Sequence, residues 1–184
     1  MANMILLRGF AKLPVVPNFQ EIYKLNPACV AVNGMYKGVS RLAGMKILEV
    51  KGITLADEFT ALENHWDEHD FFYLHFKKTD TCGENGDFDG KVKAIEEFDE
   101  QFSRLLALNP DVVIVTGDHS SPAVMKFHSW HPVPLMIWSR YSRPDDVAEF
   151  GERVCSHGSL GHVSARHVLP IALANAGRVA KYGA

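Results

Sequence analysis

Several kinds of sequence feature are missing from this 184-residue chain, and each absence excludes a class of protein. The chain has only three cysteines, Cys29, Cys82 and Cys155, and none stands in a CxxC pair or at zinc-finger spacing. A disulfide framework is therefore excluded, and a reducing cytoplasm is the expected location. No apolar run approaches the ~20 residues of a membrane helix. The first residues lack the basic and long apolar regions of a signal peptide, so we expect none.

The chain also lacks an excess of basic residues, internal repeats and flexible linkers. Its formal net charge is -3 and its pI is near 6.3, whereas nucleic-acid-binding proteins usually carry a basic surface. We therefore expect no nucleic-acid partner. Hydrophobic residues make up 47% of the sequence, enough to form a buried core. The sequence predicts one domain over residues 1–184.

Short apolar runs alternate with amphipathic segments along the chain. This alternation predicts an α/β fold, in which a mostly parallel sheet carries helices on both faces. Strands are expected at residues 4–9, 28–33, 46–52, 70–76, 112–117 and 132–138. The near-continuous apolar run at 112–115 is typical of a strand in a parallel sheet. Helices are expected at residues 34–45, 55–69, 91–108, 143–154 and 164–183, and a polar loop is expected after residue 76.

Acidic and imidazole side chains follow two of the predicted strands. Thr79 and Asp80 come after one strand, the triplet Gly117-Asp118-His119 ends another, and His128 stands nine residues further on. In sheets of this class, ligands bind beyond the carboxyl ends of the strands. Carboxylates and imidazoles held there could bind divalent metal ions. Residue type alone leaves a second interpretation open, because Asp118 could cap a turn and the histidines could be ordinary hydrogen-bonded loop residues.

Several motifs in a fixed order resemble one enzyme family. The segments are "ANMILLRGFAKLP", "GMYKGVSRLAGM", "HFKKTDTCGENGDFDGKVKAIEEFD", "VTGDHSSP…KFHSWHPVPL" and "GSLGHVSARHVLPIAL". Together they resemble the C-terminal half of archaeal-type cofactor-independent phosphoglycerate mutases, which belong to the alkaline phosphatase superfamily. The resemblance implies a partial alkaline-phosphatase-like sheet. It also implies metal-dependent phosphoryl transfer between 3-phosphoglycerate and 2-phosphoglycerate, in glycolysis.

The resemblance implies roles for individual residues. Asp118 and His119 would bind one divalent ion, while Asp80 and His128 would bind another. The ions would be manganese or magnesium, with zinc or cobalt as further candidates. Glu84 occupies a position where the family motif has a metal-binding histidine, and a carboxylate there suits manganese or magnesium. The remaining implied roles are contacts to the phosphate or carboxylate of phosphoglycerate, by Lys37 and by Arg8.

The resemblance also implies that this chain matches only part of the family's length. The family's N-terminal half, which carries the nucleophilic serine and a further ion-binding aspartate, is not matched, so we expect no catalytic nucleophile here. A partial sheet should expose an edge or an apolar face, so we expect a complementary N-terminal half or a second copy of the chain as partner. Two other functions stay open: a truncated, non-catalytic homologue that acts as a binding module, and a stand-alone metal-dependent phosphohydrolase.

Overall fold

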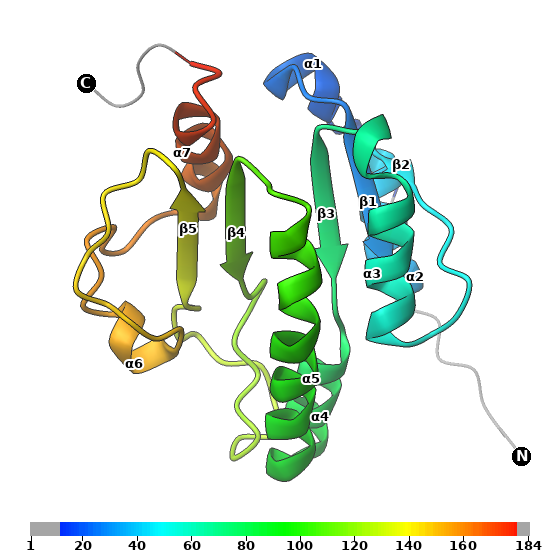
Figure 1. Ribbon diagram of the computed structural model, residues 1–184. Helices are drawn as coiled ribbons and strands as arrows, with labels where there is room; N and C mark the ends of the chain where they lie inside the picture. The colour runs from blue at the N-terminus through cyan, green and yellow to red at the C-terminus, as the bar shows by residue number, and fades with distance from the viewer. Residues whose placement is uncertain (1–11, 180–184) are drawn as a thin grey trace, which may run out of the picture. The chain divides into compact units, whose positions relative to one another are not determined.

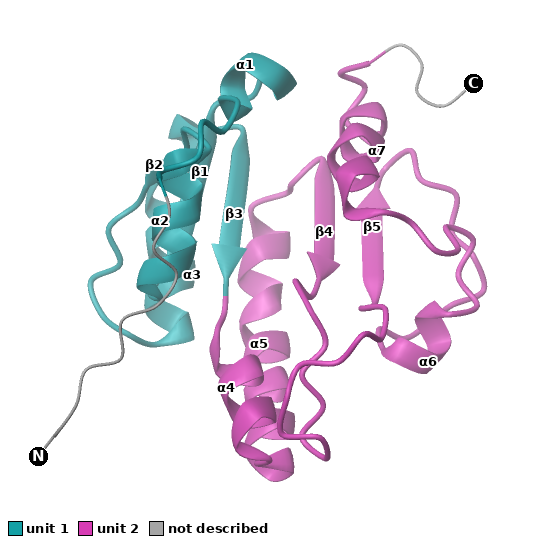
Figure 2. Ribbon diagram, turned by 180° about the vertical axis from the view of Figure 1, so that it is seen from behind, with its two compact units in different colours: residues 1–75 teal, residues 76–184 magenta. Residues whose placement is uncertain are grey.

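The computed structural model describes residues 12–179. The described chain forms two compact units, and Figure 2 colours them separately. Unit 1 extends to His75, and unit 2 begins at Phe76. The strand expected at residues 4–9 lies outside the described residues.

Unit 1 is built on a parallel three-stranded sheet with the strand order β2-β1-β3. Ala28 of the central strand lies opposite Lys46 on one side and Phe72 on the other. The sheet is flanked by three helices and a short 3-10 turn. In chain order, unit 1 contains α1 (Phe19–Tyr23), β1 (Pro27–Ala31), α2 (Gly34–Leu42), β2 (Lys46–Ile47), α3 (Leu55–Asn64), η1 (Trp66–Glu68) and β3 (Phe71–His75).

The core of unit 1 lies around β1, whose five residues are all buried. Helix α3 begins with a capping box between Thr54 and Asp57, and it buries Leu55, Phe59 and Leu62 at helical spacing. The connection from β1 to β2 and that from β2 to β3 run in opposite directions across the sheet. Because parallel crossovers are right-handed, α2 and α3 cover opposite faces of the sheet.

Unit 2 combines a helical hairpin with a two-stranded antiparallel sheet. Helix α4 ends at Gly86, whose φ of 72° is easily adopted only by glycine. Asp87 then caps α5 by accepting a hydrogen bond from the Gly90 backbone. The chain reverses between the two helices, and α4 and α5 pack together, as Figure 1 shows. Unit 2 contains α4 (Lys78–Asn85), α5 (Phe88–Ala107), β4 (Val112–Thr116), β5 (Leu135–Ser139), α6 (Glu152–Cys155), η2 (Ala165–His167) and α7 (Val168–Asn175).

The structure confirms the α/β class and the parallel sheet, and it corrects several local predictions. Residues 78–85 form helix α4 rather than a polar loop, and Gly86 caps the C-terminal end of this helix. The prediction failed because the segment has a polar composition. Three expected elements are shorter than predicted: the helix at 143–154 is reduced to α6, the helix at 164–183 to η2 and α7, and the strand at 46–52 to β2. Strand β4 pairs antiparallel with β5, since an apolar run predicts a buried strand but not its direction. The prediction of a single domain is not tested by this division into units.

Among the residues that the structure describes, none of the helices combines the length and apolar character needed to cross a bilayer.

Candidate metal centre

Helix α4 brings two of the predicted ligands together. Asp80 and Glu84 are four residues apart, so one helical turn places both carboxylates on the same side of α4. The Asp80 side chain is only 11% exposed, whereas that of Glu84 is 49% exposed. The helix therefore presents a buried carboxylate beside a solvated one.

The loop between β4 and β5 supplies the imidazoles. An isolated bridge between Ser120 and Ser129 folds this loop back on itself, and the Ser129 N–H donates to the Ser120 carbonyl oxygen at 2.8 Å. The residues just before each of these serines are His119 and His128. Their rings consequently lie together, with centroids 4.0 Å apart.

The imidazoles face the carboxylates of α4. His128 Nε2 is 3.6 Å from Asp80 Oδ1 and 3.3 Å from Glu84 Oε1. His119 Nδ1 is 3.7 Å from the same Asp80 oxygen. One donor atom from each of Asp80, His119 and His128 lies within 4.8 Å of the other two. Asp118 completes the group, because its Oδ2 is 3.5 Å from His119 Nε2.

Two neighbouring side chains hold Asp80 in its ionised form. Burial alone would raise the pKa of this carboxyl group. Hydrogen bonds donated by Lys77 Nζ to Oδ2 and by Ser121 Oγ to Oδ1 have the opposite effect, as does the positive charge of Lys77. The pKa of Asp80 is therefore lowered, and the carboxylate stays charged and ready to bind a cation.

The donor set is chemically suited to a divalent ion. A carboxylate with two imidazoles matches borderline transition metals such as manganese, zinc or cobalt better than magnesium, which prefers oxygen ligands alone. The five ligands predicted from the sequence all belong to unit 2, and the structure gathers them at α4 and the β4–β5 loop.

Comparison with known proteins gives this geometry its context. The family model described as "Metalloenzyme superfamily" matches residues 1–175. The chain belongs to the Metalloenzyme superfamily. A curated superfamily relative from Thermosipho africanus, named as a probable 2,3-bisphosphoglycerate-independent phosphoglycerate mutase, is 56% identical over 99% of this chain. Proteins of the same name from Thermotoga maritima and Thermus thermophilus are 48% and 49% identical. The resemblance inferred from the motifs is thereby confirmed.

The chain spans 45% of the length of these curated relatives. Two solved structures are similar to it. A protein from Pyrococcus horikoshii has a TM-score of 0.88 and 32% identity, and the match covers 97% of this chain and 50% of that one. The cofactor-independent phosphoglycerate mutase from Thermoplasma acidophilum has a TM-score of 0.72 and 26% identity, with coverage of 90% and 41%.

The predicted substrate contacts belong to other parts of the chain than unit 2 and stay predictions. Lys37 belongs to α2 of unit 1, and Arg8 lies outside the described residues. The sequence analysis missed Lys77 and Ser121, which both contact Asp80. Lys77 could have been found if residues 78–85 had been recognised as helical, because a lysine three residues before an aspartate then faces it. Ser121 had no comparable signal, since its contact spans 41 positions in the chain.

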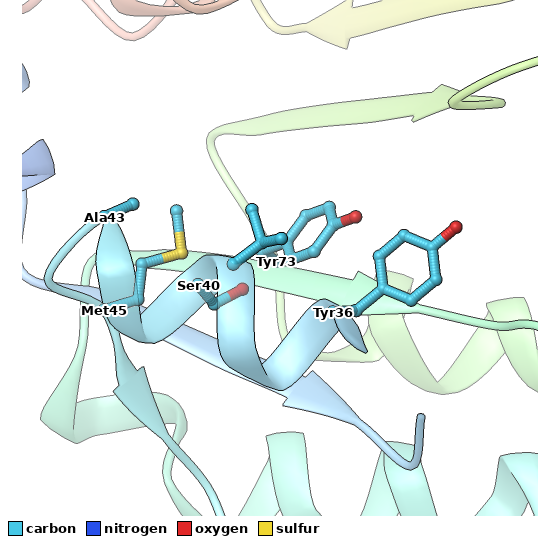
Figure 3. A pocket seen from close by; sticks show the side chains of 6 residues that line it. Tyr36, Ser40, Ala43, Met45 and Tyr73 are labelled. Carbon is cyan, nitrogen blue, oxygen red and sulfur yellow. The ribbon is translucent and has the colours of Figure 1, made fainter. Parts of the chain in front are cut away.

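Unit 1 has a hollow of a different kind. Figure 3 shows Tyr36, Ser40 and Ala43 along α2, with Met45 and Tyr73 beside them. The hollow has a volume of about 160 Å³, and Val39 completes its lining. The lining contains three hydroxyl groups but no acid, histidine or cysteine, so it is unsuited to holding a metal ion.

Proposed function

We propose that this chain provides the metal-binding part of a cofactor-independent phosphoglycerate mutase, which interconverts 3-phosphoglycerate and 2-phosphoglycerate. The observation that carries the proposal is the convergence of the Asp80, His119 and His128 donor atoms within 4.8 Å. That convergence occurs in a chain whose curated relatives are named as probable mutases of this kind.

Two sets of side chains would hold two ions. Asp118 and His119 form one set, and Asp80, Glu84 and His128 form the other. Bound ions would polarise the phosphoryl oxygens and stabilise charge that develops on them. The chain's own part is to fix the donors on α4 and the β4–β5 loop, and to keep Asp80 ionised through Lys77. The imidazoles favour manganese, zinc or cobalt over magnesium in both sets.

We expect the rest of the reaction to depend on groups outside the segment that this chain matches in its relatives. We expect the nucleophilic serine to come from the part of the relatives that the chain does not match, either as a complementary N-terminal half or within a larger assembly. Lys37 and Arg8 are the proposed contacts to the phosphate or carboxylate of phosphoglycerate, since both can pair with anions. The cytoplasm, where glycolytic substrates occur, is the proposed location.

Metal binding is the first test. Titration of the full chain with Mn²⁺, followed by calorimetry, should give saturable binding. Replacement of Asp80 by Asn should weaken that binding by about 100-fold, since it removes the charged oxygen ligand that is most buried in the donor set. Asp89→Asn, an exposed aspartate in the first turn of α5, is the matched control and should bind like the wild type. Equal affinity in all three proteins would contradict the proposed site.

Mutase activity is the second test. The full chain alone should not convert 3-phosphoglycerate in an enolase-coupled assay. Coexpression with the unmatched segment of the Thermosipho africanus relative should produce activity that Asp80→Asn removes. Manganese binding without any complementation would instead favour the non-catalytic binding module. Activity of the chain alone, with release of inorganic phosphate, would favour the phosphohydrolase.

A further inference from the structure

Ser121 lies between two of the proposed metal ligands. The residue is 3% exposed, and its hydroxyl group reaches in two directions. Oγ donates a hydrogen bond to Asp80 Oδ1 and lies 3.1 Å from His119 Nδ1. The hydroxyl therefore joins a carboxylate on α4 to an imidazole in the β4–β5 loop.

The single proton of this hydroxyl fixes the direction of both hydrogen bonds. An ionised carboxylate can only accept, so Ser121 Oγ must give its proton to Asp80. Ser121 Oγ then has only lone pairs left for His119. A short contact between two acceptors would be repulsive, so His119 Nδ1 must carry a proton and donate it to Ser121. The chain of donors runs from His119 through Ser121 to Asp80.

This direction decides which nitrogen of His119 can bind a metal ion. A neutral imidazole protonated at Nδ1 has its free lone pair at Nε2. His119 Nε2 faces Asp118, with the carboxylate oxygen 3.5 Å away. By distance alone, His119 could share an ion with Asp80 and His128. The proton at Nδ1 leaves Nε2 as the nitrogen that can bind an ion, and Nε2 is the nitrogen beside Asp118.

The backbone around Ser121 is held from two helices. Lys91 Nζ of α5 donates to the Ser121 carbonyl oxygen at 2.7 Å. Gly83 of α4 packs so closely on the same carbonyl group that a β-carbon at position 83 would collide with it. The Ser121 hydroxyl is thus presented at a fixed place, as a residue that orients a ligand requires.

We propose that Ser121 is a positioning residue, which holds the His119 ring in the tautomer protonated at Nδ1 and so directs Nε2 to an ion shared with Asp118. The inference rests on the metal site of the proposed function. It adds to that site the residue that orients His119 toward the ion already assigned to His119 and Asp118.

The tautomer can be measured directly in the full chain without metal. Proton–nitrogen correlation spectra report which ring nitrogen carries a proton, and a His119→Gln variant assigns the signals. We expect the wild-type His119 to be protonated at Nδ1 and not at Nε2. Protonation at Nε2 alone would overturn the proposal. Because this measurement uses no substrate and no metal, it is independent of whether the mutase assignment is right.

Variants then test the hydroxyl group. Ser121→Ala should populate both His119 tautomers and lower the Mn²⁺ affinity by about 10- to 100-fold, as losses of such orienting groups do. Ser121→Thr keeps the hydroxyl group that accepts from His119, so its Mn²⁺ affinity should stay within about threefold of the wild type. Equal losses in the Ala and Thr variants, or no loss in Ser121→Ala, would contradict the proposal.

The same loop contains a matched control. Ser129 Oγ lies 2.8 Å from His131 Nδ1, which is also a serine–histidine pair two residues apart. Ser129→Ala should leave both the His119 tautomer and the Mn²⁺ affinity unchanged. If Ser121→Ala does not fold, as circular dichroism would show, the wild-type spectrum alone decides. If the tautomer is as expected but no Mn²⁺ binds to the wild type, the proposed function fails while the role of Ser121 in orienting the ring stands.

Discussion

Each unit buries one carboxyl group, and the pKa values of the two groups are shifted in opposite directions. Glu58 on α3 of unit 1 is 3% exposed, and its Oε1 accepts a hydrogen bond from the Val32 N–H at 3.0 Å. Burial raises the pKa of Glu58 to about 7 despite that hydrogen bond. Asp80 of unit 2 is also largely buried, yet its pKa is lowered, because Lys77 and Ser121 donate to it.

The difference lies in the partners that each unit supplies. Unit 1 surrounds its carboxyl group with an apolar core, so the neutral form is favoured. Unit 2 surrounds Asp80 with a cation and a hydroxyl group, so the charged form is favoured. Unit 1 is therefore expected to respond to substitution mainly through stability, and unit 2 mainly through ligand binding.

The largest effect is expected in the core of unit 1. Phe59 is 1% exposed, and Phe59→Ala should lower the free energy of unfolding by about 3–5 kcal/mol, because it leaves a cavity. Urea denaturation followed by circular dichroism measures this. Phe88→Ala, which truncates an exposed ring at the start of α5 in unit 2, should cost under about 1 kcal/mol. Similar losses of stability in both variants would contradict the contrast between the two units.

Glu58→Gln tests the raised pKa of the unit 1 carboxyl group through the pH dependence of stability. The folded pKa near 7 exceeds the ordinary value of 4.5. Between these values the unfolded chain releases a proton that the folded chain keeps. The contribution of Glu58 to stability is therefore complete below about pH 4.5, and it is lost as the pH rises through about 7. The loss amounts to roughly 3 kcal/mol. Gln cannot ionise, so urea titrations of Glu58→Gln from pH 4.5 to 8 should lack this loss.

The control for that experiment is Glu49→Gln, which changes an exposed carboxylate of the same unit. It should keep the wild-type dependence on pH. A Glu58→Gln variant with the same slope as the wild type would show that Glu58 ionises normally in the folded protein.

The next test compares two helical glycines, one in each unit. Gly83→Ala forces a β-carbon against the Ser121 carbonyl group, so it should destabilise the protein by about 1–3 kcal/mol and weaken Mn²⁺ binding. Gly38→Ala in α2 meets open space, and it should stabilise the protein by about 0.5–1 kcal/mol without changing Mn²⁺ affinity. Denaturation and calorimetry on both variants provide the measurements.

The smallest expected effect concerns the choice of metal. Glu84→His restores the imidazole that the family motif has at this position, and His128 Nε2 lies 3.3 Å from the present carboxylate. The replacement should shift preference from Mg²⁺ toward Zn²⁺ or Co²⁺ by about tenfold, because imidazole is the softer ligand. Competition calorimetry with Mg²⁺ and Zn²⁺ measures the ratio of the two affinities. An unchanged ratio would indicate that Glu84 stays in solvent.

Much of the fold could be predicted from local patterns. The buried run of β1, the amphipathic α3 and the long α5 all had the apolar spacing of their structures. The prediction failed where the local signal was weak. The segment around Asp80 is polar, and its helical form depends on the cap at Gly86 and on packing against α5. The direction of β4 depends on β5, about 20 residues further along the chain.

The fold class, the family and the candidate metal-binding side chains could be read from the sequence, because apolar spacing and the order of motifs are visible along the chain without knowing which residues meet. Which donor atoms come together depends on the tertiary structure. Asp80 contacts Ser121 across 41 positions, and the bridge between Ser120 and Ser129 places His119 beside His128. Such contacts follow from chain reversal and close packing, so the pKa of Asp80 and the orientation of His119 depend on neighbours that are distant in the sequence.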